Sequence, residues 1–364
     1  MSAAPEPRAN PLLLDQEAAE ARLLEAEASG RLPHAWLFVG PRGIGKATLA
    51  FRFARYLLAG GAAAVGQEGP GLFGEVPAPA SLAMSPEHPV FHQVRASGHP
   101  DLVTIAREVD AKTGRTKRDI SVESVRKATD FLRLTSAGGG RRLVVVDSAD
   151  DMNPNSANAL LKVLEEPPQA AILLLVSHSP GALLPTIRSR CRTLALRPLP
   201  TETVERLLGE FRPELEAEDR RGLAVLAEGS IGRAEALAEL GGLALYRELL
   251  RYLEALPRLD VARLHEFGER LARDSSGEAF RTVGELLERW LARLLRVGAG
   301  GAPPPEVVPG EAELIARLLQ RSSLESWLQL WERLSGLFSR TEGASLDRKQ
   351  AILTAFLALQ ARAA

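Results

Sequence analysis

The sequence predicts an α/β domain with a parallel sheet, followed by an all-helical region. Within residues 1–200, short apolar runs alternate with segments of helical periodicity. This alternation is typical of parallel strands that are covered by helices on both faces. After Pro198 and Pro200 no further strand-like run occurs, and apolar residues recur at helical spacing. The 364 residues, 45% of them hydrophobic, are sufficient for two or three domains with substantial cores.

The expected strands are short and almost entirely apolar, and they lie at residues 37–39, 102–105, 143–146, 172–176 and 193–196. Residues 47–58, 122–134 and 155–166 are expected to form helices, the last of which is stopped by two prolines. The second of these helices should bury a mostly apolar face, made of Val122, Val125, Phe131, Leu132 and Leu134. Residues 60–100 are rich in Gly, Pro and Ala, which predicts a flexible insertion.

The region after residue 200 shows only strong helical signals. Residues 200–240 predict a small bundle that is broken at Gly229 and at Gly241-Gly242. A proline- and glycine-rich loop is expected at residues 298–310. Further along the chain, apolar residues with i, i+3, i+4, i+7 spacing indicate long helices. These residues are Phe280, Val283, Leu286, Leu287, Trp290, Leu291 and Leu294, then Trp327, Leu330, Trp331, Leu334 and Phe338, then Ile352, Phe356 and Leu359.

Composition excludes several classes of protein. The net charge is −1, so any contact with DNA must come from a local basic patch. Cys191 is the only cysteine, which excludes an internal disulfide and a cysteine-based zinc site and favours a reduced compartment. The polar N-terminus does not predict a signal peptide, and no run of about 18 apolar residues predicts a membrane span. We therefore expect a cytoplasmic protein without membrane contact.

A glycine-rich segment follows the first expected strand and opens a helix, as a phosphate-binding P-loop does. Its glycines let backbone N–H groups turn toward a phosphate, and the helix N-terminus adds positive potential. The expected nucleotide contacts are Gly40, Pro41, Arg42, Gly43, Ile44, Gly45 and Lys46. Ala47 stands where a Ser or Thr hydroxyl normally holds Mg²⁺. Thr48 lies about 100° further around the helix, so we do not expect it to replace that hydroxyl.

The apolar run at residues 143–146 ends in Asp147, which has the form of a Walker B motif. Asp147 is expected to hold Mg²⁺ through water. Active ATPases of this type carry a second carboxylate at the next position to orient or deprotonate the attacking water. Here that position is Ser148, which cannot act as a base.

Two further segments carry a family resemblance: ALLKVLEEPP at residues 159–168 and LLPTIRSRC at residues 183–191. They resemble hallmark segments of the AAA+ clamp-loader subunits of bacterial DNA polymerase III, and their spacing to both Walker motifs also agrees. The specific resemblance covers roughly residues 10–240. It implies an AAA+ P-loop domain over residues 1–198, a helical lid over 199–242 and a helical collar domain, used for oligomerisation, over 243–364.

In this family the arginine of the Ser-Arg-Cys segment reaches into the ATP site of a neighbouring subunit. The resemblance assigns that role to Arg190. An arginine suits it because the charge is permanent and the planar guanidinium matches phosphate oxygens. Without the flanking segments, Arg188 and Arg190 would be interpreted as surface or salt-bridge residues.

Departures from the motor pattern separate this chain from ATP-hydrolysing members. Besides Ala47 and Ser148, Gly232 stands where the lid of a motor subunit carries a phosphate-sensing arginine, and Arg233 is displaced by one position. Loss of three catalytic positions with retention of Arg190 indicates a non-motor subunit. The alternative is an ATP-hydrolysing AAA+ motor subunit of a clamp loader or a related DNA-remodelling ATPase.

Relatives often carry a four-cysteine zinc module in the region that matches residues 60–100. None of those cysteines is present here. His88, His92 and His99 fall in this region, but three histidines without cysteine are interpreted as loop residues, so no metal site and no zinc are expected. The cofactor expectation is ATP or ADP with Mg²⁺, held weakly or as a structural ligand.

A basic segment precedes the helix expected at residue 122. Its cations Arg115, Lys117 and Arg118 are candidate contacts to a phosphate backbone. A solvated basic loop explains the segment equally well. The resemblance implies partners as well: gamma/tau motor subunits and the delta subunit in a hetero-pentameric ring, the sliding clamp, and primed DNA reached through the assembly.

Overall fold

A computed structural model describes residues 4–61, 81–110, 114, 116–136, 139–344 and 346–364. The chain forms two compact units, one of residues 1–203 with 229–232 and the other of residues 204–228 with 233–364. The division of the helical part into a lid over 199–242 and a collar over 243–364 stays a prediction. In the described part of the chain, no helix is both long and apolar enough to cross a membrane.

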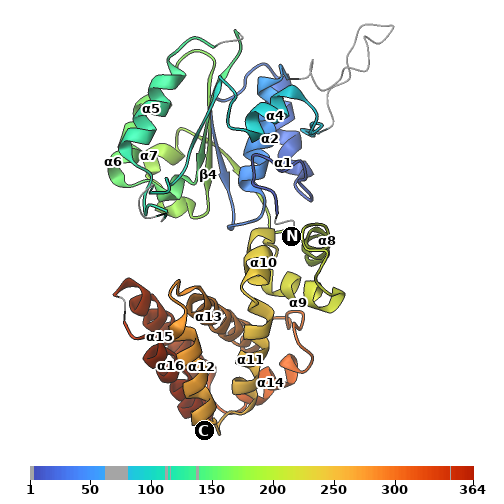
Figure 1. Ribbon diagram of the computed structural model, residues 1–364, viewed down its shortest axis with the longest axis vertical. Helices are drawn as coiled ribbons and strands as arrows, with labels where there is room; N and C mark the ends of the chain where they lie inside the picture. The colour runs from blue at the N-terminus through green and yellow to red at the C-terminus, as the bar shows by residue number, and fades with distance from the viewer. Residues whose placement is uncertain (1–3, 62–80, 111–113, 115, 137–138, 345) are drawn as a thin grey trace. The chain divides into compact units, whose positions relative to one another are not determined.

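The first unit contains a five-stranded parallel sheet with the order β2-β3-β4-β1-β5 (Figure 1). The strands are β1 (Ala35–Val39), β2 (Leu102–Ile105), β3 (Arg142–Asp147), β4 (Ala171–Ser177) and β5 (Arg192–Ala195). All five expected strands are confirmed, with bounds that differ by no more than two residues. In the central strands β1, β3 and β4 the register brings Val39 beside Ser177, and Asp147 beside Val176. The carboxyl ends of the central strands therefore share one edge of the sheet.

Helices cover both faces of this sheet, as predicted. One face carries α1 (Glu17–Ala28), α2 (Lys46–Leu58) and α4 (Pro89–Arg95), and the other carries α5 (Val122–Leu132), α6 (Pro154–Glu165) and α7 (Pro185–Arg188). Side chains alternate along a strand, so Trp36 and Phe38 of β1 pack in the core beneath α1, α2 and α4. Leu37 packs in the core beneath α5, α6 and α7. The α/β class is confirmed.

Two expectations for this unit were wrong. The expected flexible insertion contains helix α4, because the His88 ring accepts a hydrogen bond from Val90 N (3.2 Å) and Phe91 and Val94 are buried. Residues 62–80 of that stretch lie outside the described residues. The second error concerns Leu134, which is 62% exposed and lies beyond the end of α5 instead of on its apolar face. The chain leaves the helix there because the Arg142 guanidinium donates to the carbonyl oxygens of Phe131 (3.3 Å) and Thr135.

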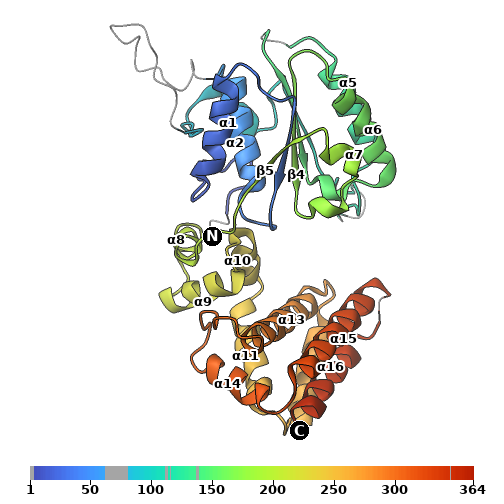
Figure 2. The same ribbon diagram turned by 180° about the vertical axis from the view of Figure 1, so that it is seen from behind.

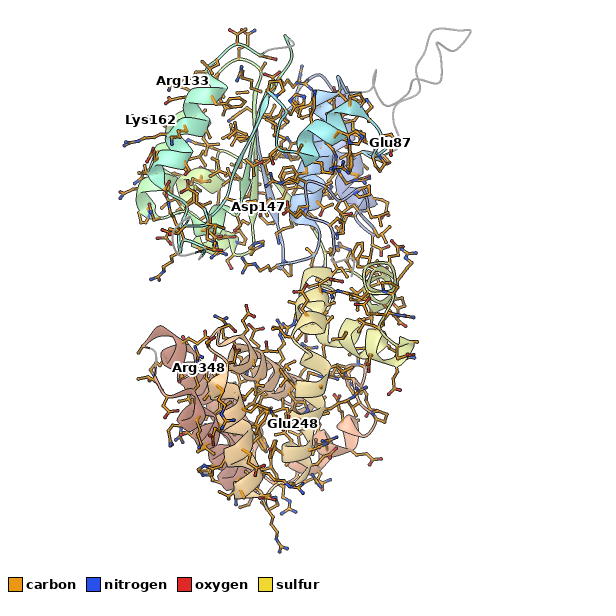
Figure 3. The ribbon with its side chains drawn as sticks, in the orientation of Figure 1. Glu87, Arg133, Asp147, Lys162, Glu248 and Arg348 are labelled. Atoms are coloured by element: carbon orange, nitrogen blue, oxygen red, sulfur yellow. The ribbon has the colours of Figure 1, made fainter. Side chains whose placement is uncertain are left out.

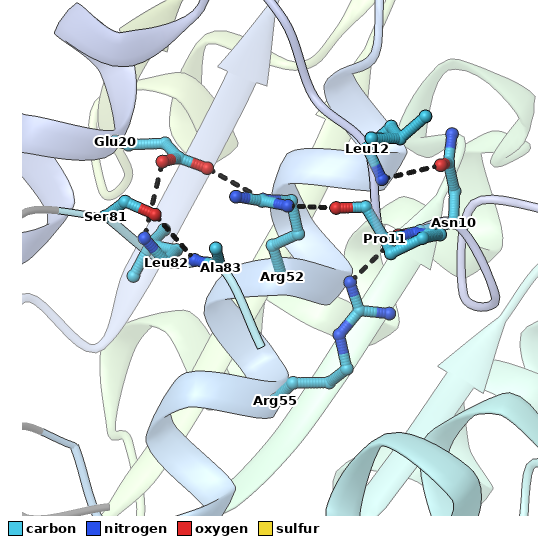
Figure 4. A network of polar contacts seen from close by, with 9 residues as sticks. All are labelled: Asn10, Pro11, Leu12, Glu20, Arg52, Arg55, Ser81, Leu82 and Ala83. Atoms are coloured by element: carbon cyan, nitrogen blue, oxygen red, sulfur yellow. Dashed lines mark hydrogen bonds and ion pairs between the residues drawn. The ribbon is translucent and has the colours of Figure 1, made fainter. Parts of the chain in front are cut away.

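Two buried arginines of α2 hold the segment that precedes α1 (Figure 4). Arg55, 1% exposed, donates to the carbonyl oxygens of Arg8 (2.9 Å) and Asn10 (3.0 Å). Arg52 donates to Pro11 O and pairs with Glu20 of α1 at 2.7 Å. These bonds connect the helix that follows the glycine loop to both the N-terminal segment and α1.

In the described part of the second unit, the secondary structure consists of helices joined by turns and loops. Its helices include α9 (Ala217–Ala227), α11 (Gly242–Glu254), α12 (Val261–Arg273), α13 (Glu278–Gly298), α14 (Glu311–Leu319), α15 (Leu324–Gly343) and α16 (Arg348–Ala363). Helices α8 (Thr201–Phe211) and α10 (Ile231–Glu239) begin in the segments where the chain passes from one unit to the other. The breaks at Gly229 and Gly241-Gly242 and the loop before Glu311 are confirmed. Every predicted apolar residue of α13 is buried.

Candidate nucleotide-binding site and exposed arginine

The glycine loop between β1 and α2 has the backbone conformation that a P-loop requires. Gly40, Gly43 and Gly45 have φ values of 143°, 75° and 97°, a region that residues with a Cβ rarely adopt. A Cβ at Gly40 would also lie 2.7 Å from Leu196 O. The loop therefore depends on glycine both for its conformation and for its close packing.

Lys46 begins α2 and is 2% exposed. Its Nζ donates to Gly40 O (2.7 Å) and to Pro41 O, so the ammonium group is bound by carbonyl oxygens of its own loop. Burial lowers the pKa of Lys46 to about 8, although the nearby carboxylates of Asp150 and Asp147 oppose this shift. The lysine remains mostly protonated at neutral pH.

Asp147 ends β3 at the edge of the sheet that also carries the glycine loop, where Figure 3 labels it. Burial raises the pKa of Asp147, and the positive charge of Lys46 partly offsets this effect. The next residue, Ser148, is 3% exposed, and its Oγ donates to Asp150 Oδ2 at 3.2 Å. The position that would carry a catalytic carboxylate thus holds a buried hydroxyl.

Asp150, which follows β3, and the polar residues at the end of β4 complete the polar side of this site. Sequence reasoning assigned them no role. Asp150 accepts hydrogen bonds from Ser177 Oγ (2.7 Å), Ser179 N (3.2 Å) and His178 N. Burial opposes ionisation of Asp150, but these bonds prevail and lower its pKa. Burial, together with the charges of Lys46 and Arg42, lowers the pKa of His178 to about 4, so His178 is neutral at pH 7.

A short segment of the chain after α9 packs directly on the glycine loop. Gly232 N donates to Gly43 O at 3.0 Å, and Ser230 Oγ donates to Arg42 O at 2.8 Å. A Cβ at Gly43 would lie 3.1 Å from Gly232 Cα. Arg233, in the helical unit, lies 3.9 Å from Glu285 of the same unit. Gly232, which stands where a motor subunit is expected to carry a phosphate-sensing arginine, therefore makes a backbone hydrogen bond to the glycine loop.

The donor set fits a nucleotide phosphate in part. The left-handed glycines and Lys46 suit a phosphate group, and Asp147 is one carboxylate that could hold Mg²⁺ through water. Ala47 offers no hydroxyl to the metal, and Thr48 is buried in α2. ATP or ADP binding by residues 40–46 and Asp147 stays a prediction.

Arg190 follows α7 in a turn at the surface. Its guanidinium lies 2.9 Å from Glu165 Oε1 and donates to Thr186 O at 3.0 Å. The side chains of Arg190 and Glu165 are 35% and 48% exposed. The arginine is accessible, and an exposed carboxylate from the end of α6 orients it.

Comparison with known proteins shows which subunits this chain resembles. Residues 83–200 match the model of the family described as DNA polymerase III, delta subunit. The DNA polymerase III subunit delta' of Pseudomonas aeruginosa PAO1 is 39% identical over 198 residues, which are 54% of this chain and 53% of the relative. Over about half of its length, this chain is similar to delta-prime subunits. The Escherichia coli K12 delta-prime subunit is 33% identical over 191 residues, or 50% of this chain and 47% of that subunit.

This chain thus spans about half the length of the delta-prime subunits that it matches. It also resembles the DNA polymerase III subunit tau of E. coli K12, at 31% identity over 231 residues, 62% of this chain and 32% of the relative. Among solved structures, a DNA polymerase III gamma subunit-related protein of Thermotoga maritima has a TM-score of 0.38 at 18% identity, covering 94% of this chain and all of that one.

Lys117, His88 and His99 have local partners in this chain. Lys117 Nζ lies 2.6 Å from Glu108 Oε2, and Arg118 is exposed. Arg115 lies outside the described residues. His88 caps α4, and His99 accepts a hydrogen bond from Asp101 N at 3.1 Å. The DNA-contact interpretation of residues 115–118 stays a prediction.

Proposed function

We propose that this chain is a non-motor subunit of the DNA polymerase III clamp loader and completes the ATP site of a neighbouring motor subunit with Arg190. The observation that carries the proposal is the contrast between two sites of one α/β unit. The site at the glycine loop offers Ala47 and Ser148 where catalysis needs a hydroxyl and a carboxylate. Arg190 is accessible on a surface turn. The delta-prime relatives support the family assignment on which this proposal depends.

In the proposed assembly Arg190 acts on a nucleotide that this chain does not bind. Its guanidinium exchanges the Glu165 carboxylate for γ-phosphate oxygens of the neighbour's ATP and stabilises the negative charge of the transition state. The pair with Glu165 is half exposed, and exposed ion pairs contribute only about 0.2–1 kcal/mol. The exchange therefore costs little compared with the gain at a phosphate.

The partners in this proposal are gamma/tau motor subunits and the delta subunit of a hetero-pentameric ring, which loads the sliding clamp onto primed DNA. Arg115, Lys117 and Arg118 are the proposed DNA contacts within that assembly. Lys117 would have to leave Glu108 to reach a phosphate, which makes Arg118 the more accessible of the two described cations.

The alternative is an ATP-hydrolysing motor subunit. Two observations favour it: Lys46 and Asp147 are retained, and the tau subunit of E. coli matches a longer part of this chain than the delta-prime relatives do. The absence of a hydroxyl at Ala47 and of a carboxylate at Ser148 weighs against it.

The test is to reconstitute the five-member ring with Arg190→Ala and to measure ATP turnover and clamp loading on primed DNA. An arginine finger is worth about 10³–10⁵-fold in rate at its own site. Because one site depends on Arg190, total ATP turnover should fall modestly, whereas clamp loading should fall much further. Arg190→Lys should not restore loading, because lysine lacks the planar fork.

The matched control is Arg188→Ala, which removes an exposed arginine two residues away and should leave both rates unchanged. Ring assembly is checked by gel filtration for each variant. If rings with Arg190→Ala assemble fully and match the wild-type protein in both rates, Arg190 is a structural residue and the proposed role is wrong.

A further inference from the structure

A hollow of about 610 Å³ lies on the α/β unit between the outer side of α1 and the edge strand β5. Both elements are labelled in Figure 2. Its volume falls within the range of about 300–1,000 Å³ that is common for ligand-binding pockets. It is lined from α1, from the turn that follows this helix, from the first half of β1 and from β5. It contains none of the residues of the glycine loop or of the turn that carries Arg190.

Three arginines line this hollow: Arg22, Arg31 and Arg192. All three are exposed, and none makes an ion pair with another described residue. The one acidic side chain of the lining, Glu25, is exposed as well. The lining therefore carries three positive charges and one negative charge, in a chain whose net charge is −1. Guanidinium groups in this situation favour oxyanions, above all carboxylates and phosphates.

The main chain of β5 contributes a second recognition element. Leu196 N donates to Val39 O of β1 at 2.9 Å. Because backbone groups alternate in direction along a strand, the N–H and C=O of Thr193 face away from β1. Arg197 O faces the same way and accepts from Gln16 Nε2 at 2.8 Å. In the described part of the chain, no strand pairs with this outer edge of β5, so Thr193 presents an unpaired donor and acceptor inside the hollow.

The base of the hollow shows a further unused donor. Trp36 belongs to the lining and is 3% exposed, yet its Nε1–H has no hydrogen-bond partner among the described residues. A buried donor of this kind usually has an acceptor, since leaving it unpaired costs about 1–3 kcal/mol. An acceptor supplied by a ligand would satisfy it.

The mixture of donors and acceptors decides which ligand fits. A nucleic-acid backbone offers only acceptors to the C=O of Thr193 and would be repelled by Glu25. The buried Trp36 exposes no ring face for base stacking. An extended peptide carries alternating N–H and C=O groups that match a strand edge, and acidic side chains would match the arginines. We propose that this hollow binds an extended acidic peptide segment of a partner protein, which adds to β5 as a sixth strand and places carboxylates on Arg22, Arg31 and Arg192.

The test uses the 364-residue chain and a fluorescein-labelled decapeptide of alternating Glu and Val, with binding followed by fluorescence polarisation. A Lys-Val decapeptide, a ten-nucleotide oligothymidylate and an acidic decapeptide with N-methylated amides are the comparison probes. We expect the Glu-Val peptide to bind, and we expect the Lys-Val peptide and the oligonucleotide to bind at least about tenfold more weakly. N-methylation keeps the charge but removes the main-chain donors, so it should weaken binding by a similar factor.

The variant Arg22→Glu with Arg192→Glu should raise the Kd of the Glu-Val peptide about tenfold or more. The matched control is Arg126→Glu with Arg133→Glu, which makes the same change in charge on and beside α5 and should leave the Kd unchanged. If the first variant does not fold, Arg22→Ala with Arg192→Ala is judged by the same criterion.

The proposal would be overturned by no saturable binding of the Glu-Val peptide, by an equal change of affinity in both glutamate variants, or by an oligonucleotide that binds as tightly as the peptide. Unchanged affinity of the N-methylated peptide would exclude strand addition and would also overturn it. The assay needs neither the ring nor ATP, so its outcome is independent of the role proposed for Arg190.

Discussion

At Lys46, the contacts in the structure differ from those that the sequence motif predicts. The motif assigns its ammonium group to nucleotide phosphates, but Gly40 O and Pro41 O accept its hydrogens here. A phosphate would have to compete with these two carbonyl oxygens, and the cost of burial already disfavours the charged form of the lysine.

We predict that Lys46 titrates near pH 8 in the folded chain. The measurement is NMR of the protein labelled with ¹³C at lysine Cε, in which six lysines give six signals and Lys46→Met identifies one of them. Burial lowers the pKa of Lys46 to about 8 from its usual 10.5, so the unfolded chain binds more protons between these values. The free energy of unfolding should therefore rise with pH from about 8 to 10.5 in the wild-type protein relative to Lys46→Met. A Lys46 signal that titrates together with those of the exposed lysines would contradict this.

Sequence reasoning found the residues of the site that belong to contiguous motifs and missed those that tertiary contact brings in. Asp147 was predicted because an apolar strand ends at it. Asp150 and His178 were not, because their roles arise from hydrogen bonds between the end of β3 and the end of β4. A polar residue directly after a fully buried strand was the available signal for His178. The pairing of Arg190 with Glu165 likewise connects two segments that the family motifs treat separately.

Secondary-structure elements were predictable where the sequence shows a single hydrophobic pattern and no competing loop signal. The buried strands β3 and β4 have runs of four and five aliphatic residues that match parallel strands covered on both faces. Helix α4 was not foreseen because the Gly- and Pro-rich sequence around it favours a loop, and only its cap and its packing stabilise seven residues as a helix. The end of α5 was placed too late because the Arg142 side chain, from another element, binds the carbonyl oxygen of Phe131.

Helix α14 depends on a buried carboxylate at its first residue. Glu311, 2% exposed, lies 3.1 Å from Arg293 Nη2 of α13 and accepts from Tyr246 Oη (3.1 Å) of α11. It also accepts from the backbone N–H of Val307 (3.1 Å) and Val308 (2.8 Å), which orders the end of the preceding loop. One side chain thus connects three helices and a loop of the helical unit.

We predict that Glu311→Ala lowers the free energy of unfolding of the helical unit by about 3–5 kcal/mol, because it leaves Arg293 buried without a counter-charge. Urea denaturation followed by circular dichroism measures this. The matched control, Glu313→Ala, removes an exposed carboxylate from the same helical turn and should change stability by no more than about 0.5 kcal/mol. Equal effects of the two substitutions would show that the Glu311 network does not stabilise α14.

On the scale of the whole molecule, the two units differ in how much of their function the sequence reveals. The α/β unit carries motifs whose spacing resembles that of a known family, and the matched family model lies entirely within it. The helical unit shows buried faces but no motif, because helix packing is satisfied by many apolar sequences of similar volume. Its proposed collar role therefore depends on the family alone.

The last prediction concerns ATP hydrolysis by the free chain. Hydrolysis requires Mg²⁺ on a P-loop hydroxyl, a carboxylate that orients water and a positive charge on the γ-phosphate. Ala47, Ser148 and Gly232 occupy the three corresponding positions. We expect turnover far below the range of about 1–10³ s⁻¹ that is typical of enzymes, both with and without primed DNA.

The sharper comparison is Ala47→Thr combined with Ser148→Glu, which restores two of the three groups. It should give weak turnover at most, because Gly232 still contributes a backbone contact where motors place an arginine. A motor subunit assayed in parallel provides the positive control, and Lys46→Met in the wild-type background detects any contaminating ATPase, since contaminant activity would survive it. Wild-type turnover at or above about 1 s⁻¹ that Lys46→Met abolishes would establish this chain as a motor and reject the non-motor proposal.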